Sequence, residues 1–191
     1  PIMIIDTDGA NITTGAKVGS IITIIEPDPV DGRTAITDEP TYAGRAGYRV
    51  RGSSSSGFAK KQFSMELWDE AGEDFPAELL GMPEESDWVL YAPGRYDRVK
   101  LSNMFMYDLS NRIGWYAPRT KFVEVYLNTG GGDITTADYW GLYILIEKIK
   151  RDGDRIDVEK LGPTDNNSPE LVGGYMLSID RSYEGQSRWG T

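Results

Sequence analysis

The clearest regularity in the chain is a series of short segments in which apolar and polar residues alternate. Residues 62–67 read QFSMEL and residues 122–127 read FVEVYL. A period of two residues is typical of a strand with one buried face. Other short segments are almost wholly apolar, as expected of strands that are buried on both faces. Together these patterns predict strands at residues 2–6, 18–26, 48–51, 62–67, 87–91, 122–127, 139–149 and 174–180.

One segment shows the longer period of a helix. Residues 101–113, LSNMFMYDLSNRI, predict a helix that Gly114 ends. We expect its apolar face to pack into the core, and the members of that face are Leu101, Met104, Phe105, Leu109 and Ile113. Residues 77–80 predict one helical turn, and residues 156–161 predict a short helix. Strands on both sides of one main helix indicate an α+β fold with a mostly antiparallel sheet.

Length and composition favour a single folded domain. The chain has 191 residues, 39% of them apolar, which is enough to bury a core of its own. The formal net charge is −10, so nucleic acid is not expected as a partner, although basic residues cluster at residues 60–61 and 148–151. No apolar run approaches the roughly 20 residues that cross a bilayer, so we expect no membrane insertion.

The chain contains no histidine and no cysteine. Disulfides, zinc sites of the Cys/His type, and catalytic Ser-His-Asp or Cys-His sets are therefore excluded. Acid–base chemistry would have to come from carboxylates, lysine or tyrosine. A bound metal would have to be a hard cation with oxygen ligands, such as Mg²⁺ or Ca²⁺.

A Gly/Ser run, RGSSSSGFAKK at residues 51–61, joins two of the predicted strands. Such a run is a flexible connector in many hairpins. Small residues also let backbone N–H groups approach an anion. Under that second interpretation the candidate phosphate ligands are Arg51, Ser53, Ser54, Lys60 and Lys61. The run matches neither the P-loop pattern nor GxGxxG, so both interpretations stay open.

Glu147 follows a long apolar run in the strand predicted at residues 139–149. A carboxylate that starts inside the protein needs a cationic partner. Lys148, Lys150 or an arginine could form a structural ion pair with it.

Five segments, in this order along the chain, resemble the spore-coat protein H (CotH) kinase family. They are RGSSSSGFAKK with the strand that follows it, LLGMPEESDWVLYAP, RIGWYAPRTKFVEVYLN, GLYILIEKIKRDGDRIDVEKL and GGYMLSID. Their order and spacing are specific to this family. The resemblance implies a kinase-like domain over residues 1–180, similar to a kinase N-terminal lobe and its continuation, with residues 181–191 as a tail or the start of a next segment.

The resemblance also implies an activity. Such proteins are atypical kinases, secreted or attached to the cell surface, that use ATP and Mg²⁺ to phosphorylate protein serine or threonine. By similarity, Lys60 or Lys61 would contact the nucleotide phosphates, and Glu147 would hold that lysine. A structural ion pair is the alternative for Glu147. Strand alternation puts Lys61 on the apolar face of the following strand. We therefore expect the Lys61 side chain, and not that of Lys60, to point toward the interior of the lobe.

The chain departs from the family pattern in three places. The catalytic and metal-binding aspartates of the family lie further along, and no segment before Thr191 matches them. Ser102-Asn103 replaces a common Arg-Asn pair, and Ala59 stands where proline is common. We therefore expect the nucleotide-binding portion of a kinase, without robust phosphoryl transfer of its own.

The alternative is a structural or binding module that has kept the fold and lost the chemistry. It would act at a cell surface or in an extracellular assembly. Its candidate surfaces are the acidic turns at residues 133–138 and 152–157, where carboxylates could bind Ca²⁺, although neither turn has the EF-hand pattern.

Overall fold

The computed structural model describes residues 1–94, 97, 99–169, 172 and 174–176. The chain divides into two compact units, Pro1–Ile149 and Lys150–Thr191. Every helix and strand assigned in the described residues belongs to the first unit. The domain boundary predicted after residue 180 lies outside the described residues.

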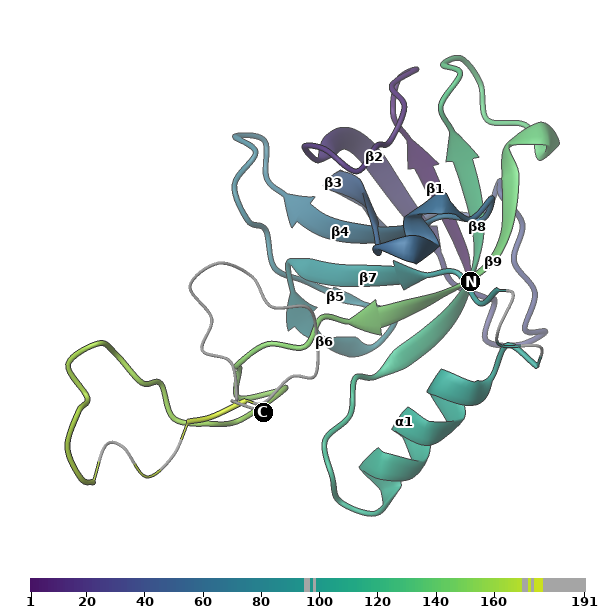
Figure 1. The fold of residues 1–191 in the computed structure, drawn as a ribbon. Coiled ribbons are helices and arrows are strands. Elements are labelled where there is room, and N and C mark those ends of the chain that lie inside the picture. The colour runs from purple at the N-terminus through teal and green to yellow at the C-terminus, as the bar shows by residue number, and fades with distance from the viewer. Residues whose placement is uncertain (95–96, 98, 170–171, 173, 177–191) are drawn as a thin grey trace. The chain divides into compact units, whose positions relative to one another are not determined.

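Seven strands of the first unit close into a barrel (Figure 1). Their order around the barrel is β1, β2, β3, β4, β7, β9 and β8. Every neighbouring pair is antiparallel except β1 and β8, which are parallel. The bounds are β1 Ile2–Asp6, β2 Val18–Ile25, β3 Tyr42–Arg51, β4 Gln62–Trp68, β7 Asp87–Tyr91, β8 Thr120–Asn128 and β9 Tyr139–Glu147.

The remaining elements of the first unit lie outside the barrel sheet. Strands β5 Ala77–Leu79 and β6 Met82–Glu85 form a separate two-stranded sheet. Two short 3₁₀ helices occupy Ser54–Gly57 (η1) and Thr136–Asp138 (η2). The α-helix α1 spans Ser102–Arg112.

The barrel strands follow the alternation in the sequence. In β4 the side chains of Phe63, Met65 and Leu67 are buried, and those between them are half-buried. The interior holds several large aromatic side chains that the solvent barely reaches. The Phe63 ring lies 6.2 Å from the Tyr143 ring and 6.4 Å from the Tyr48 ring, measured between centroids. Burial of such rings is the main force that holds the strands together.

The C-terminal part of strand β9, Tyr143 to Glu147, is covered on both of its faces, which explains the apolar run there. Tyr143 and Leu145 belong to the interior core, whereas Ile144 and Ile146 belong to a smaller cluster on the outer wall. Residue Glu147 ends this strand, in register with Trp88 of β7.

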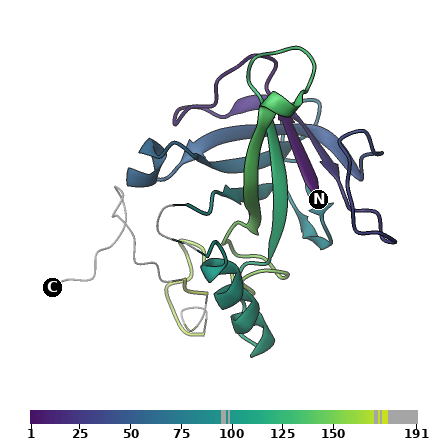
Figure 2. The ribbon, with the colours of Figure 1, turned by 90° about the vertical axis from the view of Figure 1, so that its right-hand side faces the viewer.

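Helix α1 lies below the barrel in both ribbon views (Figures 1 and 2). It covers nearly the same residues as the helix predicted at 101–113, but none of its residues is buried. Met104 and Tyr107 pack against the outer cluster, while Phe105 is 64% exposed. Leu101, Leu109 and Ile113 are also exposed. The prediction that this apolar face packs into the core is therefore wrong.

The predicted α+β fold, resembling a kinase N-terminal lobe with a main helix, is also wrong. The described residues form a closed seven-stranded barrel, and the one helix among them buries no residue and so forms no layer of the core. A strand in an open sheet and a strand in a barrel show the same period of two residues. The pattern therefore did not distinguish the two architectures.

Three shorter predictions also differ from the structure. Residues 77–79 form β5 instead of a helical turn, because the left-handed Leu80 (φ 55°) and Gly81 (φ 70°) turn the chain back into β6. Residues 156–161 contain no helix. Residues 174–176 of the predicted last strand carry no strand assignment, and residues 177–180 lie outside the described residues.

None of the helices in the described part of the chain combines the length and the apolar character needed to cross a membrane.

Candidate functional site

The Gly/Ser run forms a compact loop between β3 and β4. Arg51 and Gln62 are the last paired residues of this hairpin. Within the loop, Ser56 Oγ donates to the Ser53 carbonyl at 2.6 Å. Gly52 has φ +101°, and a Cβ there would come within 2.0 Å of Ser55 Oγ, so the turn requires glycine. Ser53 and Ser54 are exposed at the start of this loop.

The two predicted lysines point to different places. Lys60 Nζ donates to the Leu142 carbonyl and lies 4.5 Å from the centre of the Tyr143 ring. Lys61 Nζ donates to the Ser56 carbonyl at 2.8 Å, back into the loop. The ammonium above a ring of the barrel core is therefore that of Lys60, although alternation favoured Lys61 as the inward residue.

Glu147 is held by Arg119, the residue before β8. The Arg119 backbone N–H donates to Glu147 Oε2 at 2.8 Å, and Arg119 Nε donates to Oε1 at 2.9 Å. The Tyr116 hydroxyl lies 3.5 Å from Oε2. The Glu147 side chain is fully buried, so these donors replace the water that the carboxylate loses. An arginine was one of the ion-pair partners that the sequence left open for Glu147.

Lys60 meets β9 near the middle of the strand, whereas Glu147 lies at its C-terminal end. Lys60 contacts Leu142, five residues before Glu147, which corresponds to about 17 Å along a strand. The structure therefore brings Glu147 together with Arg119. The role of Glu147 as the holder of a nucleotide lysine stays a prediction.

A cavity of about 360 Å³ lies on the outer wall of the barrel, between the strands and α1. We call it the wall cavity. Its lining combines apolar, aromatic and charged side chains, namely Arg51, Gln62, Val89, Tyr91, Asn103, Tyr107, Pro118, Ile146, Glu147, Lys148 and Ile149. Two of the predicted site residues, Arg51 and Glu147, thus line one cavity although they are far apart in the sequence.

The charged groups of the wall cavity differ in how they are paired. Lys148 Nζ binds Asp87 Oδ1 at 2.8 Å, and Glu147 binds Arg119. Arg51 forms no ion pair with any described residue. Partial burial lowers the pKa of Arg51, and the nearby Tyr107 hydroxyl offsets part of this effect. Among the described residues, therefore, no carboxylate binds the Arg51 guanidinium in this cavity.

Sequence reasoning missed several lining residues. Gln62 and Tyr107 carry no motif of their own. Asn103 was named in the sequence only because Ser102-Asn103 replaces the Arg-Asn pair that is common in the family. These residues reach the cavity through strand register and the position of α1, which a single sequence does not display.

The described residues do not fit a resident Mg²⁺ ion. They contain no group of three or more acidic, His or Cys side chains that could hold a metal. Glu147 is the one carboxylate among the described residues that line the wall cavity, and Arg119 already binds it. In the acidic turn at residues 133–138, Asp138 accepts hydrogen bonds from the Thr135 backbone N–H and hydroxyl and so caps η2.

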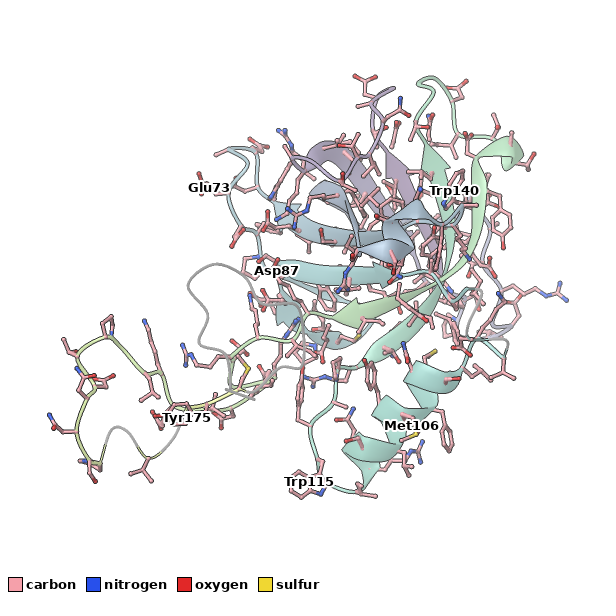
Figure 3. The ribbon with its side chains drawn as sticks, in the orientation of Figure 1. Glu73, Asp87, Met106, Trp115, Trp140 and Tyr175 are labelled. Carbon is pink, nitrogen blue, oxygen red and sulfur yellow. The ribbon has the colours of Figure 1, made fainter. Side chains whose placement is uncertain are left out.

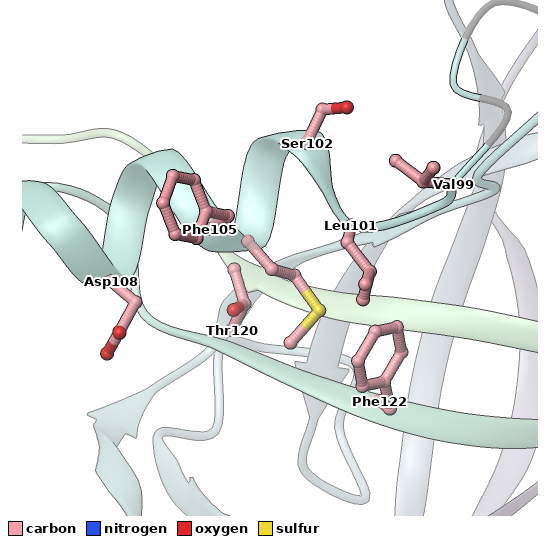
Figure 4. Close-up of a pocket in the computed structure, with 8 residues that line it drawn as sticks. Val99, Leu101, Ser102, Phe105, Asp108, Thr120 and Phe122 are labelled. Atoms are coloured by element: carbon pink, nitrogen blue, oxygen red, sulfur yellow. The ribbon is translucent and has the colours of Figure 1, made fainter.

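A larger cavity of about 600 Å³ lies between α1 and β8 (Figure 4). Apolar side chains dominate its lining, among them Val99, Leu101, Phe105 and Phe122. Asp108 is the charged residue in that lining. Because none of the described lining residues of this cavity is cationic, it suits a phosphate-bearing ligand less well than the wall cavity does.

The chain belongs to the CotH kinase protein family, whose family model matches residues 48–188. The five segments that carry the resemblance all lie within this match, so the resemblance is confirmed. Membership makes the chain kinase-like at the level of the family. Comparisons with curated proteins and with solved structures give no match.

Proposed function

We propose that this chain is the nucleotide-binding portion of a CotH-type protein kinase, with ATP as its ligand. The observation that carries the proposal is that Arg51 and Glu147 line the same cavity, and that Arg51 has no ion-pair partner among the described residues. Family membership supports it independently.

The lining of the wall cavity suits both the base and the phosphates of a nucleotide. Val89, Ile146 and the aromatic rings of Tyr91 and Tyr107 offer apolar surface to a planar base. The Arg51 guanidinium can bind phosphate oxygens through two parallel N–H donors. Arg51 also begins the loop that contains Ser53 and Ser54 and leads to Lys60 and Lys61, so further phosphate donors follow it directly along the chain.

The buried pair of Glu147 and Arg119 has a supporting role in this proposal. It gives the cavity a rigid wall, since both carboxylate oxygens are fixed by donors. Phosphoryl transfer to protein serine or threonine, with Mg²⁺ on the ATP phosphates, belongs to the intact kinase, and so does a secreted or cell-surface location. For this chain alone the proposal is binding.

Calorimetric titration of ATP, with and without Mg²⁺, tests the proposal. We expect Arg51→Gln to weaken ATP binding by about 10- to 100-fold, the usual effect of losing a charge-assisted hydrogen bond. Arg49→Gln is the matched control, because Arg49 is exposed on the same strand and does not line the cavity. Equal effects of the two substitutions would contradict the assignment.

A second candidate is a structural or binding module without nucleotide chemistry. It is favoured by the Arg119 partner of Glu147, which is the ion pair expected of a purely structural glutamate. A folded chain that binds no ATP in the same titration would support this candidate over the first.

A further inference from the structure

A further cavity, of about 380 Å³, lies beside β8. We call it the tyrosine cavity, and its lining residues are Pro1, Ile2, Thr34, Glu124, Tyr126 and Tyr139. Its size is within the range of sites that bind small ligands. The tyrosine cavity and the wall cavity have no described lining residue in common, so a ligand of the one does not depend on a ligand of the other.

The pairing of β8 with β9 brings three of these side chains together. In β8 the half-buried Glu124 and Tyr126 alternate with buried residues that belong to the interior core, so both side chains point outward. Tyr139, the first residue of β9, is the register partner of Tyr126. Side chains at paired positions, and at positions diagonal to them, are within reach of one another. One carboxylate and two phenol rings therefore meet on the outer wall of the barrel.

The two tyrosine rings stand at an angle to one another. Their centroids lie 5.4 Å apart, and their planes are inclined by 56°. Tyr139 is 48% exposed, so a ligand can reach this ring pair from the solvent. A flat sugar ring could stack on only one of two rings inclined in this way. A cation, in contrast, is attracted by the negative face of each ring that it approaches.

The Glu124 carboxylate is held in place by one of these tyrosines. The Tyr139 hydroxyl donates to Glu124 Oε2, and the Glu124 backbone N–H donates to the Pro1 carbonyl at 3.0 Å. The hydrogen bond to Glu124, with a smaller effect of burial, raises the pKa of Tyr139 to about 12, so the hydroxyl keeps its proton and remains the donor. A carboxylate has about four acceptor positions, and the Tyr139 hydroxyl occupies one of them.

The charge of Glu124 has no ion-pair partner in the described part of the chain, where no lysine, no arginine and not the amino group of Pro1 forms such a pair with it. Glu124 raises the pKa of Lys60, but the Lys60 ammonium binds the Leu142 carbonyl. The chain as a whole carries a formal charge of −10, which attracts cations to its surface. The tyrosine cavity thus combines a negative charge with two aromatic faces.

We propose that the tyrosine cavity binds a guanidinium group. A guanidinium is planar and weakly hydrated, so it stacks on an aromatic face, and its parallel N–H donors match a carboxylate. An ammonium group is more strongly hydrated and has no planar face for stacking. The inference goes beyond the proposed function and does not rest on it. Free arginine and an arginine side chain of a polypeptide are the two sources of this group.

NMR titration of the chain with N-acetyl-arginine amide tests the inference. We expect Glu124→Gln to weaken binding about 10-fold, because glutamine still accepts the Tyr139 hydrogen bond but carries no charge. Tyr126→Leu should weaken binding about two- to five-fold, the usual value of a cation–π contact, whereas Tyr126→Phe should keep the native affinity. Glu78→Gln is the control, because Glu78 is exposed on β5 and outside the lining of the cavity. It removes the same charge and should leave the affinity unchanged.

Further titrations separate the possible ligands. If N-acetyl-arginine amide binds at least as tightly as free arginine, the inference holds with a polypeptide as the source, and tighter binding of free arginine supports it with the amino acid as the source. Equal binding of N-acetyl-lysine amide would show that charge alone is recognised, and would overturn the inference. Equal losses in Glu124→Gln and Glu78→Gln would overturn it too. So would a folded native chain that binds cellobiose but neither form of arginine, or that binds none of these probes.

Discussion

At the residue scale, the most informative group is the carboxylate of Glu147. Its burial could be predicted, because the residue follows a long apolar strand. Its partner could not, because Arg119 precedes it by 28 positions and meets it only through the pairing of β8 with β9. One residue supplies both a backbone and a side-chain donor, which satisfies both oxygens.

This pair leads to a stability prediction. Arg119→Leu should destabilise the fold by about 3–5 kcal/mol, because it leaves a buried carboxylate without its countercharge. Lys148→Gln is the control: the Lys148 side chain is about half exposed, so loss of its ion pair with Asp87 should cost about 1 kcal/mol or less. Urea unfolding of both variants measures the difference. Similar midpoints would mean that Arg119 contributes little.

For the site residues, the sequence indicated which residues to consider but not where their side chains lie. Arg51 and Glu147 were chosen from motif and burial, and the structure places both at the wall cavity. Lys60 and Lys61 were chosen from the same motif. Their ammonium groups bind the Leu142 and Ser56 carbonyls, and their contact with phosphate stays a prediction. Strand alternation assigns a face to each lysine, but a long flexible side chain can reach around the edge of a strand.

At the scale of elements, the position of α1 in the chain was predicted correctly from its period and from the glycine that ends it. The packing of the helix against the barrel was not. A helical stripe indicates only that one face is apolar. In this chain four of the five members of that face are exposed, namely Leu101, Phe105, Leu109 and Ile113. Figure 3 labels two further exposed apolar residues of this region, Met106 on the helix and Trp115 after its C-terminal end. The contacts of α1 with the barrel come from one member of that face, Met104, and from Tyr107, which is not part of it.

Two methionines of α1 provide a matched test of this arrangement. Met106 is 57% exposed, so Met106→Gln should change the free energy of unfolding by about 0.5 kcal/mol or less. Met104 is half-buried against the outer cluster, so Met104→Gln should cost about 1 kcal/mol or more. Methionine and glutamine have similar helix propensities, so packing dominates the difference. Equal losses in chemical denaturation would mean that Met104 is packed no better than Met106, and would contradict the contact of α1 with the outer cluster.

At the scale of the whole molecule, the strands were largely predictable and the closed barrel was not. β1, β2, β7 and β8 lie within a residue or two of the predicted ranges. Closure depends on the parallel pairing of β1 with β8, whose residues are separated by more than a hundred positions. No local pattern encodes a pairing of that range, since each strand needs only one buried face to produce its alternation.

Closure predicts that the N-terminal strands are part of the core and not an accessory. Ile24 on β2 is 1% exposed and Ile21 on the same strand is 53% exposed. Ile24→Asp should therefore destabilise the fold by several kcal/mol, because it buries a charge without a partner. Ile21→Asp should change stability by about 0.5 kcal/mol or less. Thermal unfolding followed by circular dichroism compares the two, and a stable Ile24→Asp chain would argue against a closed barrel.

The closed barrel has a consequence for how this family is delimited. The family match begins at residue 48, inside β3, and leaves out β1 and β2. A fragment cut at that position would interrupt a continuous ring of hydrogen bonds and leave β8 and the remainder of β3 with unpaired main-chain groups. Unprotected strand edges of this kind recruit other chains into aggregates. Expression work on members of this family should therefore choose its first residue from the strand pairing and not from the start of the sequence match.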